Sequence, residues 1–143
     1  MSDATAEWGN RRAPTLAELD AMAERAYERL PEAVRKQCGD VIVRVEELPA
    51  DEVLDDLDIE SPFDLLGLYR GSGLAARDTA TIPHGPDMVF LYRRPILDYW
   101  AEFDEPLGHI ITHVLVHEIG HHFGLSDADM ERIEAEAKDG GLR

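Results

Sequence analysis

The sequence predicts an α+β protein in which a small sheet of about three strands packs against one long helix. Three short runs rich in β-branched and aromatic residues stand between segments of helical periodicity. One of those segments, near the C-terminus, is apolar around most of its circumference. Since such a helix must be covered by other elements, N-terminal and C-terminal helices are expected to complete the core.

The length of the chain, 143 residues, predicts a single domain with a substantial core. Residues 1–13 are small, polar and charged, with Trp8 their one large apolar side chain, and are expected to form a flexible tail. The single domain then spans residues 14–143. Cys38 is the lone cysteine, which excludes both an intramolecular disulfide and a zinc site built from several cysteines.

The composition also limits the partners and the compartment. A net charge of −16 opposes binding to phosphate backbones, so no nucleic-acid partner is expected. Neither a secretory signal nor an apolar run of about 18 residues is evident, which predicts a cytoplasmic protein without a membrane partner. The sequence does not indicate an oligomeric state.

The first helix is expected to begin at Thr15, because Thr15 and Glu18 have the spacing of a capping box. Apolar residues recur at helical spacing from there to Pro31. The acidic segment 50–60 is interpreted as a solvated loop or short helix, since its carboxylates do not follow the pattern of a calcium loop. A helical turn is expected over 32–37, and strands over 41–45, 65–70 and 88–92.

The second half of the chain leads to the long helix. Gly71 to Gly73 are interpreted as a turn, residues 74–87 as an irregular loop, and 96–103 as a short aromatic helix. The long helix is predicted to start near Asp104, whose carboxylate would cap it, and to end at Gly124. A short terminal helix is expected after Asp127.

Five of the six histidines lie in the stretch from His109 to Asp127, on this long helix. His117, Glu118 and His121 spell H-E-x-x-H. The two histidines share one helical face and can bind a single zinc ion. Glu118 lies about 100° around the helix, beside the ion, where it can act as base for a bound water. The alternative, three hydrogen-bonded core residues without a metal, leaves costly buried polar groups.

Two neutral histidines require a third ligand. Gly124 can adopt positive φ and end the helix, so that the chain doubles back and brings Asp127 to the ion. Asp127 also stands where a carboxylate caps a following helix, so both roles remain open for it. Glu131 and Glu134 are the next candidates for the third ligand.

The remaining histidines carry weaker hypotheses. His109 and His113 extend the same spacing of four residues, which gives His113 a possible role in orienting the ligands or facing the substrate. His122 points about 140° away from His117, towards another surface. His84 is expected to be solvated in a loop.

The motif from His117 to Asp127, HEIGHHFGLSD, resembles the active helix of the minimal zincin-like metallopeptidases, a family of short bacterial proteins. The likeness extends over roughly residues 41–129 and implies an α+β fold with a small sheet on a zinc-binding active-site helix. It also implies His117, His121 and Asp127 as Zn²⁺ ligands and Glu118 as the catalytic base. The larger metzincins have a histidine in place of Asp127 and a methionine turn for which this chain has no evident counterpart.

These observations predict a zinc metallopeptidase, a hydrolase in which Glu118 assists the attack of zinc-bound water on a peptide bond. Its partner would be a peptide or protein substrate, and the acidic surface favours a cationic one. A metal-dependent endoribonuclease is one alternative, because its histidine spacing is similar, although the charge opposes it. A zinc-stabilised binding module without turnover is the other alternative.

Overall fold

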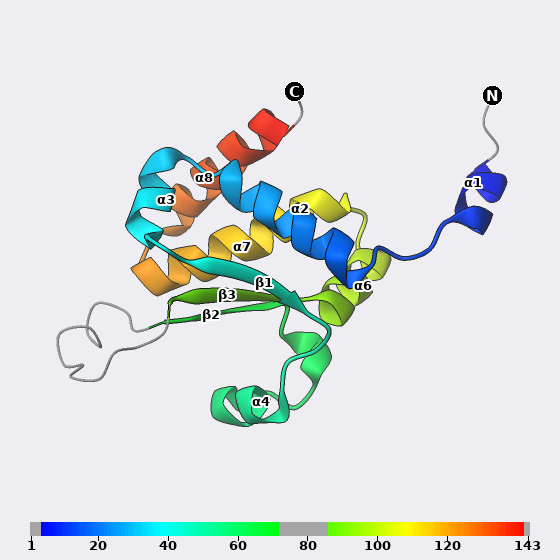
Figure 1. Ribbon diagram of the computed structural model, residues 1–143, viewed down its shortest axis with the longest axis horizontal. Coiled ribbons are helices and arrows are strands. Elements are labelled where there is room, and N and C mark those ends of the chain that lie inside the picture. The colour runs from blue at the N-terminus through cyan, green and yellow to red at the C-terminus, as the bar shows by residue number, and fades with distance from the viewer. Residues whose placement is uncertain (1–3, 72–85, 142–143) are drawn as a thin grey trace.

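The computed structural model describes residues 4–71 and 86–141, and a three-stranded mixed sheet lies at the base of its core (Figure 1). The order of the strands is β1-β3-β2, with β1 parallel and β2 antiparallel to β3. In the central strand, the side chains of Val89 and Leu91 are fully buried. The predicted α+β class with a small sheet is confirmed. The strands are β1 (Ile42–Glu46), β2 (Gly67–Arg70) and β3 (Met88–Tyr92).

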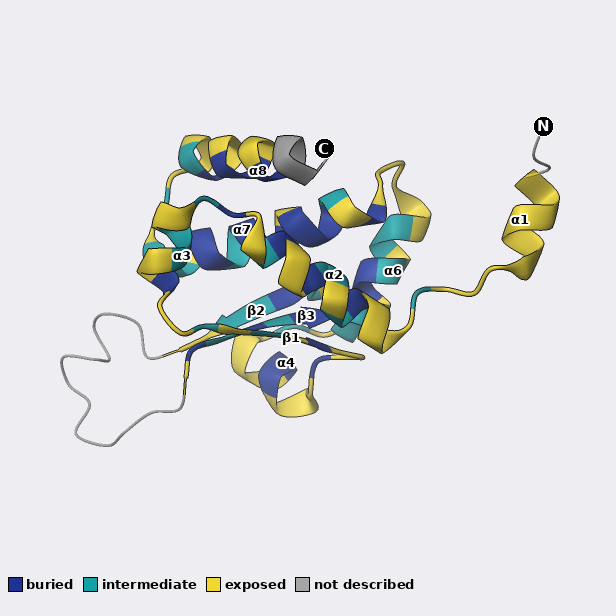
Figure 2. Cartoon of the chain, turned by 45° about the horizontal axis from the view of Figure 1, so that its top comes forward, coloured by how far each residue is buried: buried dark blue, intermediate teal, exposed yellow. Residues whose placement is uncertain are grey.

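The helices form layers on the sheet. Helices α2 (Leu16–Glu28) and α7 (Leu107–Phe123) cover one face, and α4 (Asp51–Leu57) lies on the other (Figure 2). Helix α8 (Asp127–Gly141) packs on the side of α7 that faces away from the sheet. Helix α7 is therefore covered from both sides, as its apolar circumference predicts. The other elements are α1 (Ala4–Asn10), α3 (Glu32–Cys38), the 3₁₀ turn η1 (Pro62–Asp64) and α6 (Arg93–Glu102).

Helix α2 begins with the predicted capping box. The backbone N–H of Glu18 donates to Thr15 Oγ1 at 3.1 Å, and the Thr15 N–H donates to Glu18 Oε1 at 2.9 Å. Two of the four free N–H groups of the helix start are thereby satisfied. The buried stripe of α2 consists of Leu19, Ala23 and Ala26, with Leu30 just beyond its end.

The predicted start of the long helix was wrong by three residues. Helix α7 begins at Leu107, with Pro106 as its N-cap and without a side-chain cap from Asp104. A proline disfavours helical geometry in the residue before it, so Glu105 stays outside the helix. The predicted end is confirmed: Gly124 has φ +70°, and the Leu125 N–H closes the helix on the Gly120 carbonyl at 2.8 Å.

Helix α1 and the start of helix α6 differ from expectation. Residues 4–10, expected to belong to a flexible tail, form α1, in which no residue is buried. Helix α6 starts at Arg93, directly after β3, because Pro95 is tolerated in a first helical turn. Ser72, Gly73, His84 and most of the expected loop 74–87 lie outside the described residues. Within the described ranges, no helix is long and apolar enough to cross a membrane.

Candidate metal centre

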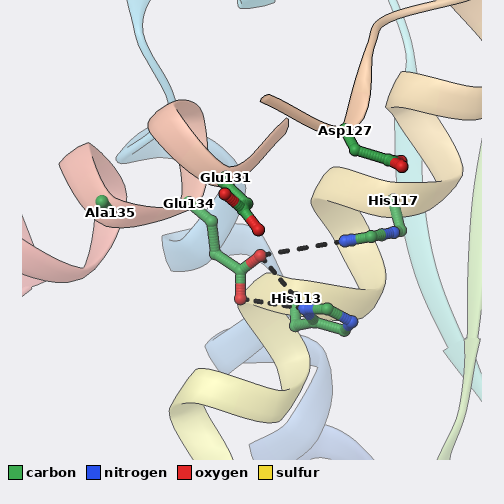
Figure 3. Close-up of a pocket in the computed structure, with 6 residues that line it drawn as sticks. All are labelled: His113, His117, Asp127, Glu131, Glu134 and Ala135. Atoms are coloured by element: carbon green, nitrogen blue, oxygen red, sulfur yellow. Dashed lines mark hydrogen bonds and ion pairs between the residues drawn. The ribbon is translucent and has the colours of Figure 1, made fainter. Parts of the chain in front are cut away.

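Histidines of α7 face carboxylates of α8 across a pocket of about 610 Å³ (Figure 3). The histidines are spaced by one helical turn along α7, and the carboxylates are spaced similarly along α8. Figure 3 shows the side chains of Glu131 and Glu134 extending from α8 into the same space as His113 and His117. The pocket is lined by His113, His117, Asp127, Glu131, Glu134 and Ala135.

A close approach at Gly120 sets the position of α8. Met130 is 1% exposed, and a Cβ at Gly120 would lie 2.2 Å from its Sδ and 2.7 Å from its Cγ. Only a glycine at this position lets the Met130 side chain rest on the backbone of α7. Gly120 directly precedes His121 on α7, and Met130 is four residues before Glu134 on α8. The contact between Gly120 and Met130 therefore fixes which carboxylates of α8 face which histidines of α7.

Three of these residues converge on one point. His113 Nδ1 lies 2.9 and 3.0 Å from the two carboxylate oxygens of Glu134, and His117 Nε2 lies 3.9 Å from Glu134 Oε2. One ligand atom from each residue falls within 4.8 Å of the others, which makes this trio a possible metal site among the described residues. Glu134 is 8% exposed, whereas the His113 side chain is 53% exposed. The trio is thus open to solvent on the His113 side.

Of the residues of the H-E-x-x-H motif, His117 lines this pocket, and the other two do not line it in the described part of the chain. The rings of His117 and His121 are 5.7 Å apart at 87°, and Asp127 lines the pocket together with His117. His121 is exposed and is not among the described residues that line it. The ligand set His117, His121 and Asp127 stays a prediction.

The second hypothesis for Asp127 is that its carboxylate caps the last helix. The capping hydrogen bond is made instead by Ser126, whose Oγ accepts from the Asp129 N–H at 3.1 Å. The Met130 N–H donates to the Ser126 carbonyl at 3.0 Å and begins the helix. This capping bond does not involve the Asp127 carboxylate, which lies beside His117 in the pocket (Figure 3).

Glu118 lies about 100° around α7 from His117, near His121 and against the edge strand β2. A Cβ at Gly67 would be 3.3 Å from Glu118 Cγ, so this glycine lets the strand approach the helix closely. The backbone N–H of Tyr69 donates to the Glu118 carboxylate. Burial raises the pKa of Glu118 above its ordinary value, and the nearby His121 and the Tyr69 N–H oppose that shift.

The electrostatics favour neutral imidazole at His117. Burial lowers the pKa of His117, and repulsion from His113 lowers it further, whereas the charge of Glu134 opposes both effects. Neutral imidazole has the lone pair that a metal ion requires. Two imidazoles and a carboxylate are ligands that zinc accepts, so the residues of the pocket fit Zn²⁺.

The other histidines are separated from this pocket. The His122 ring stacks on Tyr69 of β2, with centroids 3.8 Å apart and an interplanar angle of 14°. It therefore faces the sheet, the different surface that its angle on the helix predicts. His109 does not line the pocket between α7 and α8 in the described part of the chain.

The sequence contains a signal for Glu134, a carboxylate on the buried face of a helix, but the predicted ligand set does not include this residue. Met130, Ile133 and Ala137 form the buried stripe of α8, and position 134 falls on the same face at helical spacing. A carboxylate in a buried stripe needs partners. From the sequence, Glu134 was a reserve ligand, and His113 was a residue that orients the ligands or faces the substrate. Their meeting depends on how α8 packs against α7.

A helix that bears H-E-x-x-H and packs between a small mixed sheet and a second helix is the arrangement of a zincin-like domain. The sequence matches the zincin-like metallopeptidase family over residues 38–137, more than two thirds of the chain. The chain belongs to this family. The matched segment contains the sheet, α7 and the carboxylates of α8. No curated protein matches the sequence significantly.

Proposed function

We propose that the protein is a zinc-dependent peptidase in which His117, His121 and Asp127 hold the metal ion and Glu118 is the catalytic base. The observation that carries this proposal is the position of Glu118, next in sequence to His117 and held against β2 by the Tyr69 N–H. Membership of the zincin-like metallopeptidase family supports it. Zinc, when bound, would lower the pKa of a water molecule and polarise the carbonyl of the scissile bond.

Glu118 would move the protons of the reaction. Because its burial raises the pKa above that of an exposed glutamate, its carboxylate is a stronger base at neutral pH. It accepts a proton from the attacking water and then donates that proton to the leaving amine. Both proton transfers use the Glu118 carboxylate. The hydrogen bond from the Tyr69 N–H holds that carboxylate at the junction of α7 and β2 during both steps.

The edge strand β2 offers a place for the substrate backbone. Among the described strands, β2 pairs only with β3, so an extended peptide can add along its other edge. The net charge of −16 favours peptides that carry positive charge. The edge strand lies on the side of α7 where Glu118 is held.

A second pocket, of about 210 Å³, lies beside His113 and would receive one substrate side chain. Leu66, Ile110 and Val114 give it apolar walls, and Glu105 adds one negative charge. Such a lining suits a side chain with an apolar stem and a cationic end, as in lysine or arginine. Its remaining lining residues are Tyr99 and His113.

The test compares Glu118→Gln with the wild-type protein in zinc content and in cleavage of a peptide library rich in lysine and arginine. We expect about one zinc per chain in both proteins, and a loss of cleavage on the order of 10²- to 10⁴-fold in the variant. Glu136→Gln, which removes an exposed carboxylate of α8, is the matched control and should cleave normally.

Three outcomes would overturn the proposal. Equal cleavage by Glu118→Gln would exclude Glu118 as the base. A wild-type protein that binds zinc, loses its fold when the zinc is chelated and cleaves no peptide would be a zinc-stabilised binding module. Saturable binding and cleavage of RNA at physiological salt would assign the site to a ribonuclease.

A further inference from the structure

The burial of Glu134 is not explained by the ligand set of the H-E-x-x-H motif. Its carboxylate is on the buried face of α8, where desolvation of a charge is costly unless partners offset it. His113 Nδ1 and His117 Nε2 both approach it, at 2.9 and 3.9 Å. When Glu134 is ionised, its carboxylate accepts the hydrogen bond and the His113 imidazole N–H donates it. A single proton thus stands between two groups that are both metal ligands when deprotonated.

We infer that His113, His117 and Glu134 form a second divalent-metal position, about one helical turn along α7 from the motif position and sharing His117 with it. Ligand atoms around a tetrahedral zinc ion lie about 3.3 Å apart, given bonds of about 2.0–2.1 Å. Glu134 Oε2 lies 3.0 Å from His113 Nδ1 and 3.9 Å from His117 Nε2, and the three ligand atoms all lie within 4.8 Å of one another, so rotations of the side chains can bring them to one ion. The ion would displace the proton on His113 Nδ1.

The two positions exclude one another because they share His117. A neutral imidazole has one lone pair, so the His117 nitrogen that faces Glu134 can bind only one ion at a time. The protein would then hold a single zinc in either of two places. At the second position the ion lies towards Glu134 and the exposed His113 side chain, away from His121. This inference rests on the proposed function, because the first of the two positions is the motif site proposed above.

The test measures zinc binding to the metal-free, full-length protein by calorimetric titration with Zn²⁺. We expect His121→Ala to bind about one zinc per chain through the second position. Adding Glu134→Gln to His121→Ala should weaken that binding on the order of 100-fold or more, at least the cost of losing a group that orients a ligand. His113→Ala in the same background should do likewise, and Glu136→Gln should not.

The variants are chosen so that they fold. His121 and His113 are exposed, and glutamine has the shape of glutamate at the buried position 134. Circular dichroism of each metal-free variant checks this directly. Titration with Co²⁺ adds a spectroscopic readout: its absorption bands in His121→Ala should change when Glu134 is replaced as well, because the ligand set changes.

The possible results separate this inference from the proposed function. If His121→Ala alone abolishes zinc binding while Glu134→Gln alone leaves it intact, the second position does not exist and the motif site stands. If Glu134→Gln alone abolishes binding while His121→Ala and Asp127→Ala bind normally, the second position is the zinc site and the proposed motif ligands are wrong. The inference also fails if His121→Ala keeps its zinc after His113 and Glu134 are both replaced.

Discussion

Replacing Gly120 with alanine perturbs the contact that positions α8 on α7. The added Cβ would lie 2.2 Å from Met130 Sδ, and Met130 is 1% exposed, so its side chain has little room to retreat. Overpacking of this kind costs about 1–3 kcal/mol. Alanine in a helix returns about 1 kcal/mol relative to glycine, so we expect a net loss of up to about 2 kcal/mol. In a domain of this length, each kcal/mol lowers the melting temperature by about 2–5 °C.

The displacement should also reach the metal pocket. Moving α8 outwards takes Asp127 and Glu134 away from His117, so the affinity for zinc should fall together with the stability. Urea denaturation of the metal-free protein measures the first effect, and calorimetric titration with Zn²⁺ measures the second.

Gly108→Ala is the matched control on the same helix. A Cβ at Gly108 meets no atom within 4 Å, so this variant should gain up to about 1 kcal/mol and keep its zinc affinity. If Gly120→Ala is as stable as Gly108→Ala and binds zinc equally well, Met130 does not fix α8 in the way described. A double-mutant cycle with Met130→Ala separates the clash from the cost of the cavity that Met130→Ala leaves.

Three further predictions concern the scaffold. Burial raises the pKa of Tyr27 from 10.0 to about 12, so folding stability should fall as pH rises from about 10 through 12, and Tyr27→Phe should remove most of that fall in urea unfolding at high pH. Arg93 donates to the Pro14 carbonyl at 2.7 Å and to Glu47 at 3.1 Å, so Arg93→Ala should lower the unfolding free energy by about 1–3 kcal/mol in the same assay, and an unchanged midpoint would contradict this. Cys38 is 2% exposed and burial raises the pKa of its thiol, so iodoacetamide should modify it only in denaturant, and rapid modification of the native protein would show that this side chain is accessible.

The elements that the sequence predicted correctly are those with a local cause. The capping box of Thr15 and Glu18, the β-branched runs of the strands and the glycine at position 124 each determine structure within a few residues. The predicted start at Asp104 was wrong because two local signals competed there. A carboxylate favoured one helix start, and Pro106 imposed another three residues later.

The site likewise has one part that local sequence spacing predicts and one part that depends on packing. Spacing along one helix is enough to predict that His113, His117 and His121 occupy one face, and that Glu118 lies beside them. No spacing along the chain predicts which carboxylate of α8 meets which histidine of α7. That pairing depends on how two helices pack, and the packing depends on the fit of Met130 against Gly120.

The burial of Glu134 bears on what the pocket between α7 and α8 is for. A leucine there would extend the apolar stripe of α8 and avoid the desolvation of a carboxylate. Since hydrophobic replacement of buried charged groups is often neutral or stabilising, the carboxylate is a poor choice for stability alone. It is a good choice for binding positive charge, because low exposure strengthens its attraction for a proton or a metal ion shared with His113 and His117. The same groups that make the metal-free pocket costly are therefore those that would bind an ion most tightly.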